Sequence, residues 1–101
     1  MEKYKVVYKK RFQQKFLGLL NYLNTERGLK VSDDFIATFQ ERITTLISNP
    51  NIGKQSTVLE VRSILITKHN RLYYRVRNGT IEVVNFYDTR INPKNNPYKQ
   101  K

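Results

Sequence analysis

Arginine, lysine and tyrosine are the residue types in this sequence that could do chemistry. The chain has no cysteine and one histidine, His69, which argues against a His/Cys metal cluster and a histidine-paired nucleophile. His69 falls in a predicted turn, and we interpret it as a turn residue. The carboxylates show no spacing typical of an acid–base pair, and there is no glycine-rich phosphate loop. We therefore expect no metal and no cofactor.

Metal-independent RNA cleavage is the chemistry that these residue types leave open. The ribose 2′-hydroxyl can itself attack the adjacent phosphate, so the protein need only hold the phosphate, neutralise its developing charge and assist proton transfer. A guanidinium suits phosphate because its planar fork donates two parallel hydrogen bonds. The candidates for this role are Arg71, Arg90 and Tyr98. The argument permits an enzyme without identifying one.

The charge of the chain points to an anionic partner. There are 19 Lys and Arg against 8 Asp and Glu, a formal net charge of +11. The excess lies in residues 1–16 and 62–101, whereas residues 17–61 are nearly balanced. Such a charge suits nucleic acid, an acidic protein or an anionic membrane. No apolar run is long enough to span a membrane, and the N-terminus lacks a secretory signal, so we expect a cytoplasmic protein.

The first half of the chain predicts a strand and two helices. Residues 4–8 are rich in aromatic and β-branched residues, which favours a strand. Apolar residues at helical spacing predict helices over 9–27 and 33–48. Gly28 is a plausible stop for the first helix, and Ser32 is the expected N-cap of the second. Gly18, inside the first helix, suggests a close helix–helix approach.

The second half predicts three antiparallel strands, over 58–67, 71–77 and 80–88. Asn78-Gly79 is a strong hairpin signal, because both turn positions need positive φ. The element order β-α-α-β-β-β predicts an α+β fold in which an N-terminal helical hairpin packs on one face of an antiparallel sheet. Residues 1–101 are expected to form a single domain, with residues 90–101 as an irregular or frayed basic tail.

The hairpin turn also predicts the two faces of the sheet. Pairing Arg77 with Thr80 places one apolar set against the helices: Leu72, Tyr74, Val76, Ile81 and Val83. The opposite face, called the open face below, then collects Arg71, Tyr73, Arg75, Arg77, Glu82, Phe86 and Asp88. Arg75 and Glu82 are expected to form a cross-strand ion pair. The register of the 58–67 strand is not fixed by its turn, so the face occupied by Arg62 stays open.

The open face mixes arginines with aromatic residues, which is typical of surfaces that hold phosphates and stack bases. The nucleic-acid-binding candidates are Tyr73, Arg75, Arg77, Lys68 and Lys94.

The segment VRSILITKHNRLYYRVRNGTIEVVNFYDTR, residues 61–90, resembles the C-terminal half of the RelE/ParE superfamily of toxins from bacterial type II toxin–antitoxin systems. The similarity lies in the order and spacing of a strand beginning VR, an Arg-Leu-x-Tyr strand, a hairpin turn and a strand ending FYDTR. The resemblance implies one of two activities. RelE-like members cut mRNA in the ribosomal A site, and ParE-like members poison DNA gyrase.

Carried over by position, the resemblance assigns Arg71 to the scissile phosphate and adds Arg62 and Arg90 as further basic site residues, with Tyr98 as the late tyrosine. Alanine at Arg71 or Arg90 is then expected to abolish toxicity. It also implies a cognate antitoxin, and the net charge of +11 favours an acidic one. Its apolar anchors are expected to dock on the helical hairpin or along its edge with the sheet, where Leu17, Tyr22 and Leu29 flank the helical stripes. The leading hypothesis is a toxin that cleaves ribosome-bound mRNA. A gyrase poison is one alternative. A non-catalytic basic nucleic-acid-binding module is another, and the absence of a histidine or other clear general base among the candidate site residues favours it.

Overall fold

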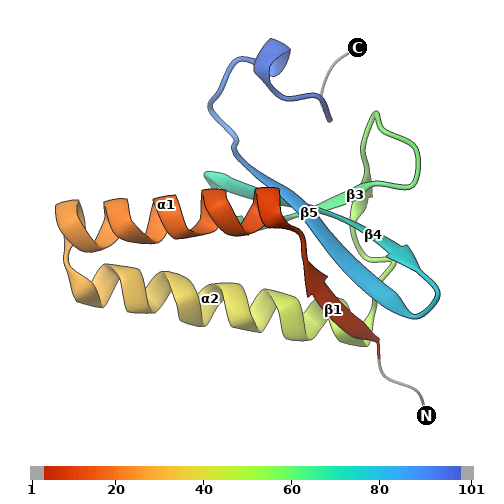
Figure 1. The fold of residues 1–101 in the computed structure, drawn as a ribbon, viewed down its shortest axis with the longest axis horizontal. Helices are drawn as coiled ribbons and strands as arrows, with labels where there is room; N and C mark the ends of the chain where they lie inside the picture. The colour runs from red at the N-terminus through yellow and green to blue at the C-terminus, as the bar shows by residue number, and fades with distance from the viewer. Residues whose placement is uncertain (1–3, 99–101) are drawn as a thin grey trace.

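The computed structural model describes residues 4–98 and has five strands, two helices and one 3₁₀ turn within them (Figure 1). In chain order the elements are β1 (Lys5–Tyr8), α1 (Lys10–Arg27), α2 (Leu29–Ser48), β2 (Lys54–Gln55), β3 (Arg62–Thr67), β4 (Asn70–Arg77), β5 (Thr80–Asp88) and the 3₁₀ turn (Pro93–Asn95). No helix in this range is long and apolar enough to cross a membrane.

The helical hairpin packs on one face of the sheet, as predicted, and its far end extends beyond the sheet (Figure 1). Phenylalanine rings from both helices form the centre of the core. Phe12 stacks on Phe39 with 5.8 Å between ring centroids, and Phe86 of β5 meets Phe12 edge-on. Such aromatic contacts add to the stabilisation from apolar burial.

The start of α2 differs from the prediction. Gly28 has φ +98°, and it both ends α1 and precedes α2, which begins at Leu29. Ser32 lies inside α2 and is buried, so it is not an N-cap. Because the glycine alone makes the turn, the chain re-enters a helix at once, and the Ser32 amide already donates to the Gly28 carbonyl.

The sheet has the order β1-β5-β4-β3-β2. The predicted antiparallel meander of β3, β4 and β5 is confirmed, and β1 adds a parallel edge strand beside β5. The helices separate β1 from the meander in the sequence, so no tight turn forces those two strands to be antiparallel. The two-residue strand β2, which pairs with β3, was not predicted.

A β-bulge changes the predicted faces of β5. Asn78 (φ +48°) and Gly79 (φ +75°) make the hairpin, and Arg77 pairs with Thr80 as expected. The register then shifts, since Tyr74 pairs with Val83 but Tyr73 pairs with Asn85. Val84 is the extra residue, and side chains beyond it exchange faces. Phe86 therefore joins the core, and Asp88 lies on the same face of β5 as Phe86. Asn85 and Tyr87 occupy the open face.

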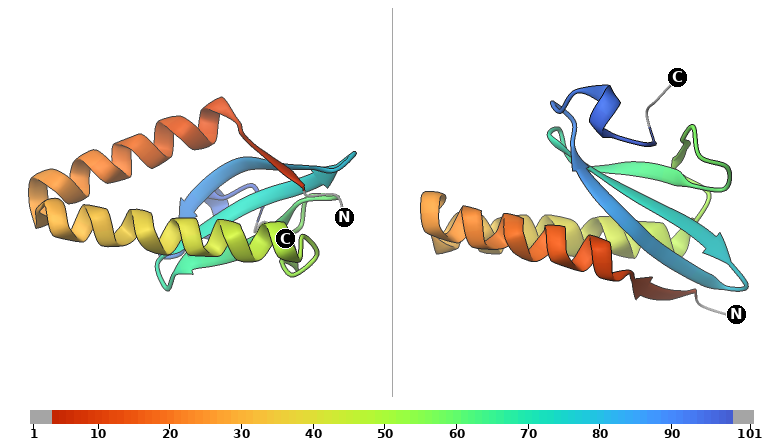
Figure 2. Two further views of the ribbon diagram at one scale, coloured as in Figure 1. Left: turned by 90° about the horizontal axis from the view of Figure 1, so that it is seen from below. Right: turned by 45° about the horizontal axis from the view of Figure 1, so that its top comes forward.

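The segment after β5 is irregular, as predicted, but its described part is not frayed. It leaves the end of β5, makes the 3₁₀ turn and returns across the sheet toward the segment between β2 and β3 (Figure 1, Figure 2). The Thr57 amide donates to the Tyr98 carbonyl at 3.2 Å. We call residues 93–98 the tail. Part of the open face is therefore covered by the chain's own tail.

Two glycines provide a matched test of this packing. A Cβ at Gly18 would meet nothing within 4 Å, so the predicted close helix–helix approach there is wrong. A Cβ at Gly53 would overlap the Tyr74 hydroxyl, which accepts a hydrogen bond from the Gly53 amide and donates to the Pro50 carbonyl. In thermal unfolding, Gly18→Ala should stabilise the protein by about 1 kcal/mol. Gly53→Ala should destabilise it by about 1–3 kcal/mol. Equal shifts for the two variants would contradict this packing.

Candidate functional site

A polar pocket of about 270 Å³ lies on the open face beside Arg71. Its other lining residues come from the segment around β2, from β3 and β4, and from the tail: Lys54, Gln55, Ser56, Thr57, Ser63, Tyr73 and Tyr98. None of these residues is acidic. The pocket therefore carries positive charge from Arg71 and Lys54 without a carboxylate to neutralise it.

The Arg71 guanidinium is held in place but is not fully paired. One terminal nitrogen, Nη1, donates to the Ser63 hydroxyl at 2.8 Å. The Nε atom is buried and has no hydrogen-bond acceptor within the described residues. A buried donor without an acceptor is costly, and a charged donor more so. The Arg71 side chain lines a pocket without carboxylates and is oriented by Ser63, so the charged guanidinium suits a phosphate in that pocket.

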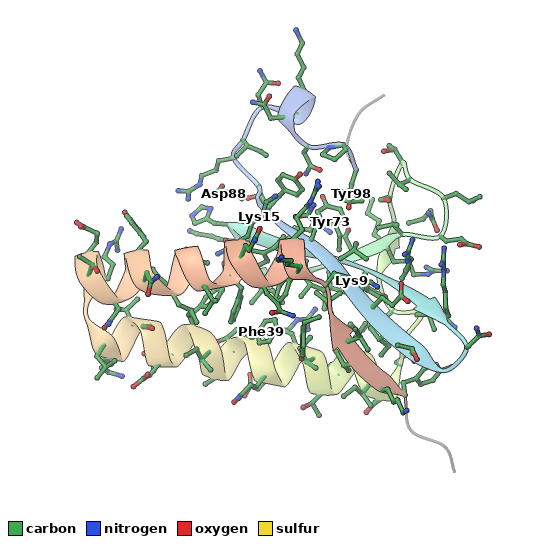
Figure 3. All side chains as sticks on the ribbon, in the orientation of Figure 1. Lys9, Lys15, Phe39, Tyr73, Asp88 and Tyr98 are labelled. Carbon is green, nitrogen blue, oxygen red and sulfur yellow. The ribbon has the colours of Figure 1, made fainter. Side chains whose placement is uncertain are left out.

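Two tyrosines, Tyr73 and Tyr98, line the pocket and lie next to each other (Figure 3). The Tyr98 ring stacks on the Tyr73 ring with centroids 4.3 Å apart, and Tyr87 meets both rings edge-on. Lys15, reaching over from α1, places its ammonium 3.3 Å from the centroid of the Tyr87 ring. Burial raises the pKa of Tyr73, which is only 1% exposed. Tyr73 is thus neutral and covered, and it cannot stack on a base in this arrangement.

The structure brings two of the four predicted catalytic residues together and places the other two elsewhere. Arg71 and Tyr98 line the same pocket. Arg62 shares the helix-facing side of β3 with Ile64, by strand alternation, and donates to the Gly53 carbonyl at 2.8 Å. It holds the segment that leads into β2 and does not enter the pocket. Arg62 therefore lies on the face of the sheet opposite to that of Arg71, which the sequence alone does not determine.

Arg90 lies on the α1 side of β5. It makes a two-pronged ion pair with Asp88, at 2.6 and 2.9 Å, and is close enough to Tyr22 of α1 to be influenced by it. Asp88 lies apart from Tyr98, with Lys15 between them in the view of Figure 3. Arg90 is exposed and can contact a substrate only outside the pocket.

The Arg90–Asp88 pair predicts a specific titration. The hydrogen bond from Arg90 lowers the pKa of Asp88 from 3.8 to about 2. Because the folded pKa is depressed, the pair stabilises the fold above about pH 4, and this contribution disappears as the pH falls to about 2. We expect carboxyl NMR to give Asp88 a pKa of about 2, moving back toward 3.8 in Arg90→Ala. An unchanged pKa in that variant would contradict the pairing.

The remaining predicted binding residues lie around the pocket rather than in it. The expected Arg75–Glu82 ion pair is present at 2.6 Å, and its hydrogen bond is the main cause of the lowered pKa of Glu82. Arg77 lies 3.7 Å from Glu60. Lys68 is exposed in the turn between β3 and β4, and Lys94 is exposed in the 3₁₀ turn.

Sequence reasoning missed Ser63, Lys54, Gln55 and Asn96 as parts of this region. Ser63 shares a face of adjacent strands with Arg71, but this depends on a strand register that the turn does not fix. No local signal marks β2, which is two residues long. Asn96 belongs to a segment without periodicity, so its burial could not be foreseen.

Comparison with known proteins identifies the family. The model of a family described as the ParE toxin of the type II toxin–antitoxin system parDE matches residues 6–93. No curated protein sequence gives a match. Within residues 4–98, the structure has no group of three or more His, Cys, Asp or Glu side chains that could hold a metal ion.

Solved structures of toxins share the fold. The chromosomal ParDE toxin–antitoxin system of P. aeruginosa aligns with a TM-score of 0.72 at 15% identity, covering 84% of this chain and 95% of that chain. The isolated E. coli RelE toxin gives 0.59 at 15% identity over 88% and 87%. The S. aureus YoeB dimer gives 0.60 at 14% identity over 89% and 100%. With the family match over residues 6–93, the resemblance to the RelE/ParE superfamily is confirmed, and the chain belongs to the ParE toxin family of type II toxin–antitoxin systems.

Proposed function

We propose that this toxin arrests translation by cutting ribosome-bound mRNA without a metal ion, and that the Arg71 pocket holds the scissile phosphate. The observation that supports this most is the Arg71 guanidinium, which Ser63 orients in a pocket lined by no acidic residue. A site of this kind favours an anion with several oxygen atoms. A ribosomal target places the toxin in the cytoplasm.

The pocket supplies the parts that such a reaction needs. The 2′-hydroxyl of the substrate attacks the phosphate held by Arg71 as its proton passes to solvent water, and the bond from phosphorus to the 5′-oxygen breaks. Negative charge grows on the phosphate oxygens in between. Arg71 and Lys54 stabilise that charge. Lys54 and Tyr98 are the lining groups that can donate a proton to the departing 5′-oxygen. Outside the pocket, the RNA backbone is contacted by basic side chains: Arg90, Lys68, Lys94, Arg75 and Arg77.

A gyrase poison is the second candidate. The observation that favours it is the family match itself, since the matched family is described as the ParE toxin of parDE. The pocket also contains no histidine that could act as a general base. A toxin that binds nucleic acid without cutting it would share that feature.

Mapping mRNA ends after induction of the toxin separates these candidates. We expect new mRNA ends at a fixed position within codons of translated frames, appearing within minutes, while plasmid supercoiling is unchanged. The induced Arg71→Ala variant serves as the reference for background ends. Unchanged mRNA ends together with loss of supercoiling would support gyrase as the target and contradict the proposal.

The antitoxin partner expected for this family has a candidate docking site away from the pocket. A groove of about 400 Å³ runs between the two helices and is lined mainly by apolar residues. Leu17 on its rim is 60% exposed, and Tyr22 and Leu29 are exposed as predicted. Acidic residues in the partner would be attracted by the +11 charge, and apolar anchors in the groove would provide affinity. We propose that the cognate antitoxin docks there.

A further inference from the structure

A buried side chain of the tail, that of Asn96, hydrogen-bonds to the sheet. Asn96 is 2% exposed, whereas Asn95 and Pro97 on either side of it are exposed. The Asn96 side-chain amide donates to the Tyr73 hydroxyl at 3.1 Å, and its oxygen accepts from the Tyr98 amide at 3.0 Å. A buried asparagine that uses both ends of its amide group fixes the local chain, because losing either contact leaves a buried polar group unpaired.

These contacts determine one wall of the Arg71 pocket. By turning the chain at residue 96, they place the Tyr98 ring on the Tyr73 ring, where it lines the pocket. The opposite wall belongs to residues 54–57. The two walls are joined directly, since Thr57 donates from its amide to the Tyr98 carbonyl and from its hydroxyl to the Pro97 carbonyl. The pocket is therefore complete only when the tail is seated.

We propose that Asn96 is a positioning residue for the phosphate site: it fastens the tail to Tyr73, which completes the pocket around Arg71, and phosphate binding in turn fastens the tail. The identity of the ligand rests on the proposed function, but the coupling between tail and pocket does not require RNA cleavage. Releasing the tail would open the pocket to water, and a more hydrated Arg71 attracts an anion less strongly. Because coupling between two equilibria is reciprocal, a bound anion must favour the seated tail to the same degree.

Amide exchange at Thr57 reports tail seating, because the acceptor for that amide is the Tyr98 carbonyl. In wild-type protein, we expect inorganic phosphate to slow Thr57 exchange and to shift the NMR signal of the Arg71 Nε proton. In Asn96→Ala, exchange at Thr57 should be about tenfold faster and phosphate affinity about tenfold weaker, as for the loss of roughly one net hydrogen bond. Exchange at Leu72, in the core strand β4, should not change.

Two further variants separate positioning from a general loss of stability. Asn95→Ala is the matched control, since it shortens an exposed asparagine in the same turn, and it should behave as wild type. Tyr73→Phe removes only the hydroxyl that accepts from Asn96 and keeps the stacking ring. It should reproduce part of the Asn96→Ala effect, and adding Asn96→Ala to it should cost less than Asn96→Ala costs alone.

The results that would overturn the proposal are equally specific. They are Thr57 exchange and phosphate affinity in Asn96→Ala within twofold of wild type, strictly additive effects in the double variant, or no effect of phosphate on the wild-type protein. Failure of the proposed function leaves a different record, namely no mRNA cleavage with the coupling between phosphate and tail intact.

Discussion

Cells that produce Arg71→Ala are expected to grow normally where the wild-type toxin arrests growth. Arg71 supplies the guanidinium that lines the pocket, and its hydrogen bond to Ser63 holds it there. Removing one well-placed donor to a charged transition state typically lowers the rate by about 10²–10³. Arg71→Lys should recover little activity, because an ammonium keeps the charge but loses the planar fork. Growth after induction, at equal protein level, is the measurement.

The matched control for this prediction is Arg27→Ala, an exposed arginine at the end of α1 that is remote from the pocket. It should stay fully toxic. Arg90→Ala should fall between the two, with a loss below about tenfold, because Arg90 is bound to Asp88 outside the pocket and contributes as an exposed charge. Full toxicity of a correctly folded Arg71→Ala protein would refute the assignment of the pocket. Complete loss of toxicity in Arg90→Ala would support the expectation from the sequence that both arginines are essential.

Leu17→Glu is expected to release the toxin from its antitoxin while leaving its toxicity intact. The substitution places a carboxylate on the rim of the apolar groove, where it removes an apolar anchor and repels an acidic partner. Truncation of an apolar anchor that a partner covers typically costs about 2 kcal/mol or more, and the added repulsion should bring the loss of affinity to about 100-fold. The dissociation constant of the purified complex is the measurement.

Leu59→Glu is the control for the antitoxin site, since Leu59 is 85% exposed but lies between β2 and β3, away from the groove. It should bind the antitoxin as wild type does. The wild-type complex should also survive about 0.5 M salt, where the Debye length is only a few ångströms, because apolar contacts are not screened. Dissociation at that salt would show that charge alone holds the partner, and equal affinity of the two glutamate variants would show that the antitoxin does not dock in the groove.

Those parts of the fold that follow from local chemistry could be predicted from the sequence. The apolar spacing in α1 and α2 and the positive φ at Asn78 and Gly79 determine the helical hairpin and the β-hairpin. The bulge at Val84 could not be predicted, because no glycine or proline marks it and the preference arises from packing Phe86 into the core. The parallel pairing of β1 also depends on contacts between distant segments.

The candidate site was predictable only in part for the same reason. Residue type makes Arg71, Arg90 and Tyr98 candidates, and the resemblance adds Arg62. The fold brings Arg71 and Tyr98 to one pocket, whereas strand alternation and the ion pair with Asp88 place Arg62 and Arg90 elsewhere. The tail has no periodicity, so the contact between Asn96 and Tyr73 that seats it depends on tertiary structure alone.

Cleavage of a defined mRNA on purified ribosomes tests the central claim most directly. Purified toxin is added to ribosomes that hold a known codon in the A site, and the ends of the labelled mRNA are analysed. Attack by the 2′-hydroxyl predicts a cut within that codon, a 5′ fragment ending in a 2′,3′-cyclic phosphate, and no cut without ribosomes or with Arg71→Ala. Intact mRNA under these conditions, or a 5′ fragment ending in a 3′-hydroxyl, would contradict the account.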